Sequence, residues 1–371
     1  MMQVVKILHL STEPYWRGGE QQIIYLTEES LKLGLMPIIG CKRDSPVEHY
    51  CRNKGLSFVS LPFKSAYDIF SVIKVIWFCK RMKIDILQTH SSKSHTIAVF
   101  AGILGLRIPQ ILTRRVNYPV KSNWFSHYKY NYFRIKKIIC ISETIQQLIE
   151  NDIKDKRKLI TIHSGVGIER FQKFIESDWL RTNYNLSKDT IIIGNSSALT
   201  EHKDYETWLN VANKILSMGI QAHFFIMGDG PQRRDVEGMI YEKGLEDHVS
   251  LLGFVDNIQE VLPSLDVFLF TSQMEGLGTS ILDAMASRVP VVSTAAGGVS
   301  ELIKHERTGM LYPIGDVEGL TTGLHRIIND QELRERLINA GSETVKQFSK
   351  EITAVKTKAV YEEILNKKAI R

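Results

Sequence analysis

Two acidic residues flank a glycine-rich turn in the second half of the chain. Glu275 and Asp283 are separated by seven residues in the segment EGLGTSILD, which follows the apolar run Val267–Phe270 and opens a helical pattern at Thr279. If the helix begins near Gly278, its unpaired backbone N–H groups and its dipole attract an anion. Carboxylates accept hydrogen bonds from hydroxyl groups. The pattern favours a ligand that carries both hydroxyls and phosphates, and two solvated acids beside a loop are the alternative interpretation.

A pair of glycines occupies a similar place near the start of the chain. Gly18 and Gly19 lie between the first apolar run and a helical pattern that starts at Glu20. Glycines before a helix let backbone amides approach an anion closely. The segment lacks both Gly-x-Gly-x-x-Gly and the Gly-Lys-Ser/Thr of a P-loop. A phosphate-facing loop and a plain tight turn are therefore both open.

Apolar strand-like runs alternate with longer amphipathic stretches along the whole chain. Helical patterns such as 20–33 and 67–82 separate these runs. Such alternation predicts right-handed βαβ units and parallel sheets covered on both faces. The expected strands are Val4–Leu10, Met36–Cys41, Ser57–Leu61, Ile84–Thr89, Gln110–Thr113, Ile138–Ile141, Leu159–Ile162, Ile191–Asn195, His223–Met227, Val249–Leu252, Val267–Phe270 and Val289–Ser293.

The length of 371 residues suits two domains. A glycine-bearing turn within 159–171 predicts the hinge, so that residues 1–165 form an N-terminal, acceptor-side domain and residues 166–349 a C-terminal, donor-binding domain. The last helical segment, 350–371, has no strand after it and is expected to join the first domain. The prediction is an α/β protein with two doubly wound, Rossmann-like domains facing across a deep cleft. Ligands of such sheets bind in the loops beyond the carboxyl ends of the strands.

Composition and charge indicate where the protein works. Four scattered cysteines are too few for a disulfide scaffold, and no apolar stretch approaches the roughly 20 residues of a spanning helix, which predicts a cytoplasmic protein. Residues 1–165 carry 25 Lys and Arg against 12 Asp and Glu, a net charge of +13. Basic and aromatic residues alternate within 118–137 and 69–83, which predicts a peripheral position on the anionic inner face of the cytoplasmic membrane. Aromatics that fill the core are the alternative, and nucleic acid is not expected because no binding module accompanies the charge.

The motifs around the acid pair resemble those of retaining glycosyltransferases of the family 4 type, which have the two-Rossmann GT-B fold. The signature of that family is two acids separated by seven residues, as in Glu275 and Asp283. The resemblance covers nearly the whole chain and is most specific over 190–315. Its other motifs here are Gly228–Pro231, Val249–Phe254, Ala284–Ala286, Gly297–Glu301 and Thr308–Gly309.

The resemblance implies roles for individual residues. Glu275 would hold hydroxyls of the donor sugar, and Asp283 would bind the nucleotide ribose. Lys203 matches the phosphate-binding lysine, and His90 matches an active-site histidine at the end of the fourth strand. The turn and loop residues expected to contact the donor are Gly18, Gly19, Gly276, Leu277, Gly278 and Thr279, and the base pocket is expected near Gly253, Phe254 and Val255.

Two positions depart from the family pattern. The second acid is usually Glu, so Asp283 is one methylene shorter than expected. An arginine usually precedes the lysine by five or six residues, and Ala198 stands there instead. The missing positive charge would have to come from elsewhere, for example from Arg17, Arg114 or Arg115.

The predicted activity is transfer of a sugar from a nucleotide-diphosphate sugar, with UDP as the favoured nucleotide, to a glycan or lipid-linked glycan acceptor such as a lipopolysaccharide or capsule precursor. The resemblance implies retention of anomeric configuration. No Asp-x-Asp occurs in the chain, so no metal site is expected, and the nucleotide sugar is a cosubstrate rather than a cofactor. A nucleotide-sugar epimerase on the same architecture and an inactive nucleotide-sugar-binding protein remain alternatives.

Overall fold

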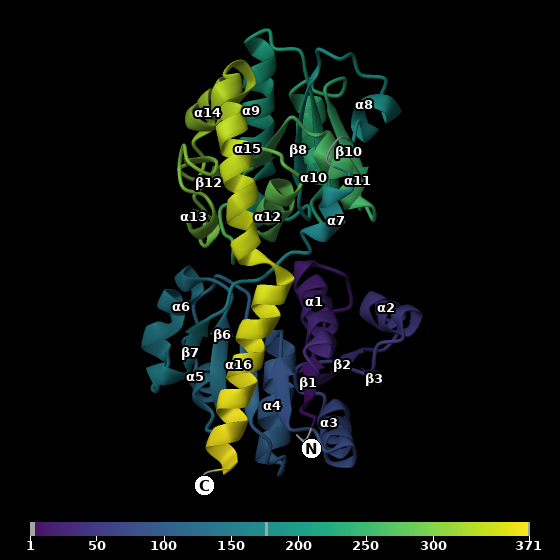
Figure 1. Cartoon of the computed structure of the whole chain (residues 1–371), viewed down its shortest axis with the longest axis vertical. Coiled ribbons are helices and arrows are strands. Elements are labelled where there is room, and N and C mark those ends of the chain that lie inside the picture. The colour runs from purple at the N-terminus through teal and green to yellow at the C-terminus, as the bar shows by residue number, and fades with distance from the viewer. Residues whose placement is uncertain (1–3, 175–176, 370–371) are drawn as a thin grey trace. The chain divides into compact units, whose positions relative to one another are not determined.

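The computed structural model describes residues 4–174 and 177–369 and divides the chain into two units (Figure 1). The first unit contains residues 1–165 and 350–371, and the second contains 166–349. Residues 370 and 371, at the end of the expected last helix, lie outside the described residues.

The first unit is built on a seven-stranded parallel sheet with the order β3-β2-β1-β4-β5-β6-β7. Its strands are β1 (Lys6–Leu10), β2 (Met36–Lys42), β3 (Phe58–Leu61), β4 (Ile86–Thr89), β5 (Gln110–Arg114), β6 (Ile135–Cys140) and β7 (Leu159–Thr161). Its helices are α1 (Gly18–Lys32), α2 (Pro46–Lys54), α3 (Ile69–Met82), α4 (Ser92–Ile103), α5 (Trp124–Asn131), α6 (Glu143–Ile149), the 3₁₀ turns η1 (Glu150–Asp152) and η2 (Lys156–Lys158), and α16 (Lys350–Ala369).

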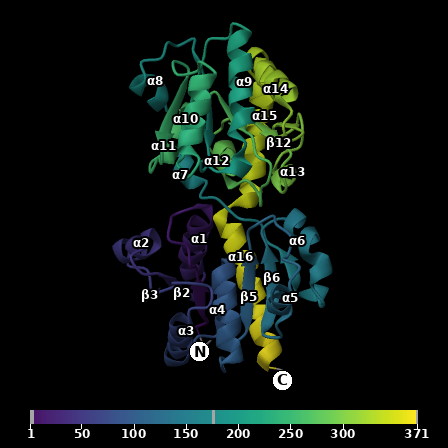
Figure 2. The ribbon, with the colours of Figure 1, turned by 180° about the vertical axis from the view of Figure 1, so that it is seen from behind.

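Both faces of this sheet are apolar because successive strand residues point to opposite sides. In β1, Ile7 packs with one cluster that includes residues of α16, and Leu8 packs with another that includes residues of α3 and α4. Ile86 and Leu87 of β4 divide in the same way. The two sides of the unit are seen in Figure 1 and Figure 2.

The last helix, α16, is distant in sequence from the sheet that it covers. Its Tyr361 is buried and donates a hydrogen bond to Oε1 of Gln88 in β4. At its start, Nζ of Lys350 lies 3.4 Å from Oε1 of Glu29 in α1. Helix α16 is therefore part of the first unit's core.

The second unit contains a six-stranded parallel sheet with the order β10-β9-β8-β11-β12-β13. Its strands are β8 (Ile191–Ser196), β9 (Ala222–Met227), β10 (Val249–Gly253), β11 (Val267–Phe270), β12 (Val291–Thr294) and β13 (Met310–Tyr312). Its helices are α7 (Glu169–Gln172), α8 (Trp179–Asn183), α9 (Tyr205–Ser217), α10 (Arg233–Glu242), α11 (Ile258–Val261), α12 (Thr279–Ala286), α13 (Val299–Leu302), α14 (Val317–Asn329) and α15 (Gln331–Val345), with 3₁₀ turns η3 (Glu201–Lys203), η4 (Leu262–Ser264) and η5 (Lys346–Phe348).

Trp208 of α9 anchors the core of the second unit. Its side chain is fully buried among residues of α10, α14 and the sheet, and its Nε1 donates a 3.1 Å hydrogen bond to the carbonyl of Leu269 in β11. A buried indole N–H without a partner would cost free energy. This bond ties α9 to the central strand.

The expected strands are present, and the structure adds the short edge strand β13. Helix α1 begins at Gly18, so the two glycines form its first turn instead of a loop before it. The four cysteines are free and buried. Among the described residues, no helix has the length and apolar character needed to cross a membrane.

Candidate functional site

The second unit places two predicted residues at the point where its strand order reverses. Strands β8 and β11 are neighbours in the sheet, yet the chain leaves them toward opposite edges, and such switch points open a crevice at the carboxyl ends of the strands. Lys203 follows β8 through η3, and Glu275 follows β11. The ammonium of Lys203 forms an ion pair with Oε1 of Glu275, and the two side chains are only 13% and 12% exposed.

The residues just after β11 hold this ion pair in place. The hydroxyl of Ser272 lies 3.0 Å from Oε1 of Glu275, and the hydroxyl of Thr271 donates to the carbonyl of Asp204 at 3.1 Å. The ammonium of Lys203 also lies 4.9 Å from the centre of the Phe270 ring, a favourable position for a cation. Sequence reasoning did not single out Ser272, because a serine after a strand has no spacing signal of its own.

The glycine-rich turn after Glu275 leads directly into α12. Gly278 is the N-cap of α12 with φ of 88°, and no side chain caps that end. A Cβ at this position would meet Ile281 and Val299 at 3.2 and 3.3 Å, and the positive φ disfavours any other residue. Leu277 beside it is buried. The turn thus presents the backbone N–H groups of the first turn of α12 without a competing side chain.

Asp283, the second acid of the pair, lies further along α12 and is partly buried. Burial raises its pKa to about 7, against an opposing effect of the Arg170 guanidinium. In the part of the chain that the structure describes, its carboxylate has no hydrogen bond or ion pair. Asp283 is therefore a half-buried acceptor without a protein partner, and it does not contact the Lys203–Glu275 pair.

The predicted base-pocket residues lie at the carboxyl end of β10. Gly253 has φ of 70° and forms a bridge with Gly228 after β9, while the Phe254 side chain is 62% exposed. A Cβ on Gly228 would lie 1.9 Å from the Ser197 carbonyl oxygen, so the loops after β8 and β9 touch backbone to backbone. Ala198, in that first loop, is exposed.

In the first unit, His90 lies at the equivalent switch point, after β4 and beside β1. Its Nε2 is 3.0 Å from Nδ1 of His9, and its Nδ1 is 3.4 Å from Nη2 of Arg115. Burial lowers the pKa of His9 to about 3, and burial together with His9 and Arg115 lowers the pKa of His90 well below its usual value. Both imidazoles are therefore neutral.

The tautomers of the two histidines follow from Arg115, which can only donate hydrogen bonds. Nδ1 of His90 must accept from Arg115, so the proton of His90 is on Nε2 and is donated to Nδ1 of His9. Both ring nitrogens of His90 are thus occupied by protein partners. His90, the histidine predicted from the sequence, therefore accepts a hydrogen bond from Arg115. His9, which the sequence did not indicate, accepts the hydrogen bond from the other ring nitrogen of His90.

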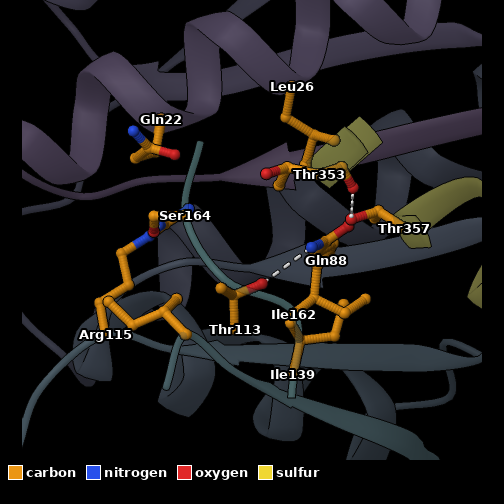
Figure 3. Close-up of a pocket in the computed structure, with 11 residues that line it drawn as sticks. Gln22, Leu26, Gln88, Thr113, Arg115, Ile139, Ile162, Ser164, Thr353 and Thr357 are labelled. Atoms are coloured by element: carbon orange, nitrogen blue, oxygen red, sulfur yellow. Dashed lines mark hydrogen bonds between the residues drawn. The ribbon is translucent and has the colours of Figure 1, made fainter. Parts of the chain in front are cut away.

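Arg115 also connects this set to the glycine pair. Its Nη1 donates to the Ser164 hydroxyl at 3.2 Å, and a Cβ on Gly19 would lie 3.7 Å from its Cδ. Figure 3 shows Arg115 turned toward Ser164 on one side of a cavity of about 20 Å³, with Gln88 and its partner Thr113 on the other. A polar cavity of this size holds about one water molecule.

The polar groups of the candidate site are oxygen, nitrogen and backbone groups suited to binding hydroxyls and phosphates. Among residues 4–174 and 177–369, no three His, Cys, Asp or Glu side chains are placed to hold a metal ion. The residues brought together are Lys203 with Glu275 in one unit, and His90 with Arg115 in the other.

Comparison with known proteins identifies the family of this chain. The model described as Glycosyltransferase Family 4 matches residues 16–170, and the model described as Glycosyl transferases group 1 matches residues 177–344. The chain belongs to glycosyltransferase family 4. Its two parallel-sheet units are those of the GT-B fold, and glycosyltransferase activity is the function common to the matching families.

Individual relatives of this glycosyltransferase have low sequence identity but match it over most of its length. The N-acetyl-alpha-D-glucosaminyl L-malate synthase of Bacillus anthracis is 26% identical over 306 residues, which cover 81% of this chain and 80% of the relative. An Escherichia coli UDP-Gal:alpha-D-GlcNAc-diphosphoundecaprenol alpha-1,3-galactosyltransferase is 24% identical over 93% of both chains. The structure of Anabaena HepE in complex with UDP and glucose has a TM-score of 0.85 at 18% identity and covers 97% of this chain and 100% of HepE.

The raised pKa of Asp283 predicts a pH-dependent contribution to stability. The native carboxyl keeps its proton up to about pH 7, whereas an unfolded Asp loses it near the ordinary aspartate pKa of 3.8. The favourable contribution of the protonated form is therefore complete below about pH 4 and is lost as pH rises through 7. We expect the unfolding free energy of the wild type minus that of Asp283→Asn to fall over this window, by at most about 1.4 kcal/mol per pH unit. Urea unfolding at pH 4 to 8 measures it, and a flat difference would contradict the assignment.

Proposed function

We propose that this glycosyltransferase moves a sugar from a UDP-sugar to a glycan or lipid-linked glycan acceptor, with retention of configuration and without a metal ion or cofactor. The observation that carries the proposal is the Lys203–Glu275 pair beside the glycine-capped start of α12. The structures of HepE in complex with UDP and with UDP-glucose and the UDP-Gal specificity of the E. coli relative support the choice of donor.

In this proposal the donor binds to the second unit through groups that are already placed. Lys203 and the backbone N–H groups at the start of α12 bind the diphosphate, because a point charge and a helix dipole both favour phosphate. Glu275, released from Lys203, accepts hydrogen bonds from sugar hydroxyls. Asp283 accepts from the ribose, and the exposed ring of Phe254 stacks on the base.

The reaction develops negative charge on the departing diphosphate, so preorganised cationic and N–H donors lower the barrier. The bond between the anomeric carbon and the diphosphate oxygen breaks, and the acceptor oxygen bonds to that carbon on the same face. The proton of the acceptor hydroxyl passes to an oxygen of the departing diphosphate. In this scheme His90 is a positioning residue for Arg115, and Gly18 and Gly19 leave room beside that guanidinium.

We further propose a peripheral position on the cytoplasmic face of a membrane. The outward face of α3 supports it, because Phe70, Ile73 and Trp77 are 69%, 55% and 55% exposed and lie three or four residues apart. Val72 and Val75, which lie within the segment 69–83 that the sequence predicts to face the membrane, instead fill the core. The lipid-facing stripe is thus a different set of apolar residues on the same helix.

Aromatic and basic side chains continue this surface. The exposed Tyr67 ring lies 6.2 Å from that of Phe125 in α5, and Trp124 beside it is 77% exposed. The Arg81 guanidinium lies 4.9 Å from the Trp77 ring. Exposed aromatics with neighbouring cations suit the headgroup region of an anionic bilayer.

A transfer assay with UDP-sugars and a glycan or lipid extract tests the activity. We expect transfer to continue in the presence of a chelator and the product to keep the donor's anomeric configuration by NMR. Glu275→Ala should lower turnover about tenfold to a hundredfold, because charge-assisted bonds contribute roughly 1.5–3 kcal/mol. Glu318→Ala removes an exposed carboxylate and should leave turnover unchanged. An epimerised donor, binding without turnover, or wild-type rates in folded Glu275→Ala would each refute the assignment.

Vesicle co-sedimentation tests the membrane surface. Binding should rise with the fraction of anionic lipid and fall with salt, because each Lys or Arg near the surface contributes about 1 kcal/mol. Trp77→Ser should weaken binding severalfold, whereas Tyr241→Ser, which removes a 74% exposed ring from the second unit, should not. No binding to any lipid mixture at low salt would rule the membrane surface out.

A further inference from the structure

Two buried cations in the first unit have no role in the site described above. Arg114 is the last residue of β5, and Lys129 lies in α5. Each side chain belongs to a residue that is only 7% exposed. Lys and Arg are rarely buried to this degree unless they are paired with an anion.

The partners of Arg114 are neutral. Its Nη1 donates to the hydroxyl of Tyr130, its Nη2 donates to the carbonyl of Tyr118, and its guanidinium lies 5.3 Å from the centre of the Tyr130 ring. Its Nε is buried without a hydrogen-bond partner. Asp152 is the acidic residue that influences Tyr130, but its carboxylate lies 3.6 Å from His127 and not against Arg114.

Lys129 is in the same condition. Its Nζ donates to the hydroxyl of Thr96 at 3.0 Å and lies 5.7 Å from the centre of the Phe125 ring. Within the described residues, neither Lys129 nor Arg114 has a carboxylate at ion-pair distance. The charges that act on Lys129 are those of Lys121 and Arg114, both positive, and they lower its pKa together with burial.

The surroundings add no negative charge. Nε2 of His95 lies 3.2 Å from the carbonyl of Lys129, and the ring of His95 lies 5.1 Å from that of Tyr130. Burial, together with the charges of Lys129 and Arg114, lowers the pKa of His95 to about 3. A neutral histidine and two like charges make this part of the unit strongly positive. An uncompensated pair of this kind is explained if an anion completes it.

We propose that Arg114 and Lys129 bind a phosphate group of the acceptor substrate. The inference rests on the proposed transferase function and extends it to the chemical class of the acceptor. The guanidinium fork, the ammonium and the hydroxyl of Tyr130 together supply donors for a tetrahedral oxyanion. The donor's diphosphate has its own cation, Lys203, in the other unit, which assigns this second set to the acceptor.

Calorimetry of the full chain with inorganic phosphate at low salt tests the proposal. The wild type should bind phosphate saturably, and Lys129→Met should bind it at least tenfold more weakly. Because Met replaces an unpaired buried charge by an apolar side chain of similar size, Tm should stay the same or rise. Lys93→Met, which removes an exposed lysine from α4, should keep phosphate affinity within twofold.

Further outcomes separate this site from the donor site and from a structural role. UDP affinity should be unchanged in Lys129→Met, and an equal fall in UDP affinity would overturn the assignment to the acceptor. Lys129→Arg keeps the charge and should keep phosphate binding. No phosphate binding by the wild type, an equal loss in Lys93→Met, or a lowered Tm with unchanged phosphate affinity in Lys129→Met would overturn the proposal. Each of these results can occur while UDP-sugar transfer is intact, so it would leave the transferase function standing.

Discussion

The ion pair between Lys203 and Glu275 is the interaction on which the second unit's site depends. Two residues 72 positions apart in sequence meet because β8 and β11 are adjacent parallel strands whose connections leave in opposite directions. Near-complete burial of both charges is tolerated because each offsets the other. The same pairing places a cation and a hydrogen-bond-accepting carboxylate side by side. A phosphate group can bind the cation, and a hydroxyl group can donate to the carboxylate.

In the first unit, neutral groups instead of a carboxylate hold the cation at the site. The partly buried guanidinium of Arg115 is held by His90 and Ser164 and has no carboxylate within ion-pair distance among the described residues. Because burial keeps His90 and His9 uncharged, they can orient the cation without cancelling it. Arg114 and Lys129 likewise have neutral partners, namely Tyr130 and Tyr118 for the guanidinium and Thr96 for the ammonium. Arg114, Arg115 and Lys129 are thus held by hydroxyls, an imidazole and a backbone carbonyl.

Much of the architecture could be predicted from the sequence, because buried parallel strands are continuous apolar runs with clear boundaries. The acid pair and the start of the following helix could also be predicted, because the spacing of the acids and the glycines between them determine both. The edge strand β13 was missed because it is three residues long and only its first, Met310, is fully buried. His9 and Ser272 were missed for different reasons. The partner of His9 is 81 residues away and meets it only in the folded sheet, whereas Ser272, three residues before Glu275, has no spacing signal of its own.

If Lys203 exchanges Glu275 for the diphosphate of the donor, loss of this lysine weakens UDP binding, which titration calorimetry measures. Lys203→Met should bind UDP at least tenfold more weakly than the wild type, because a charge-assisted contact to phosphate contributes roughly 1.5–3 kcal/mol. Lys214→Met, which removes a partly exposed lysine paired with Glu318, serves as the matched control and should bind UDP normally. Unchanged UDP affinity in a folded Lys203→Met would contradict the binding of the diphosphate by Lys203.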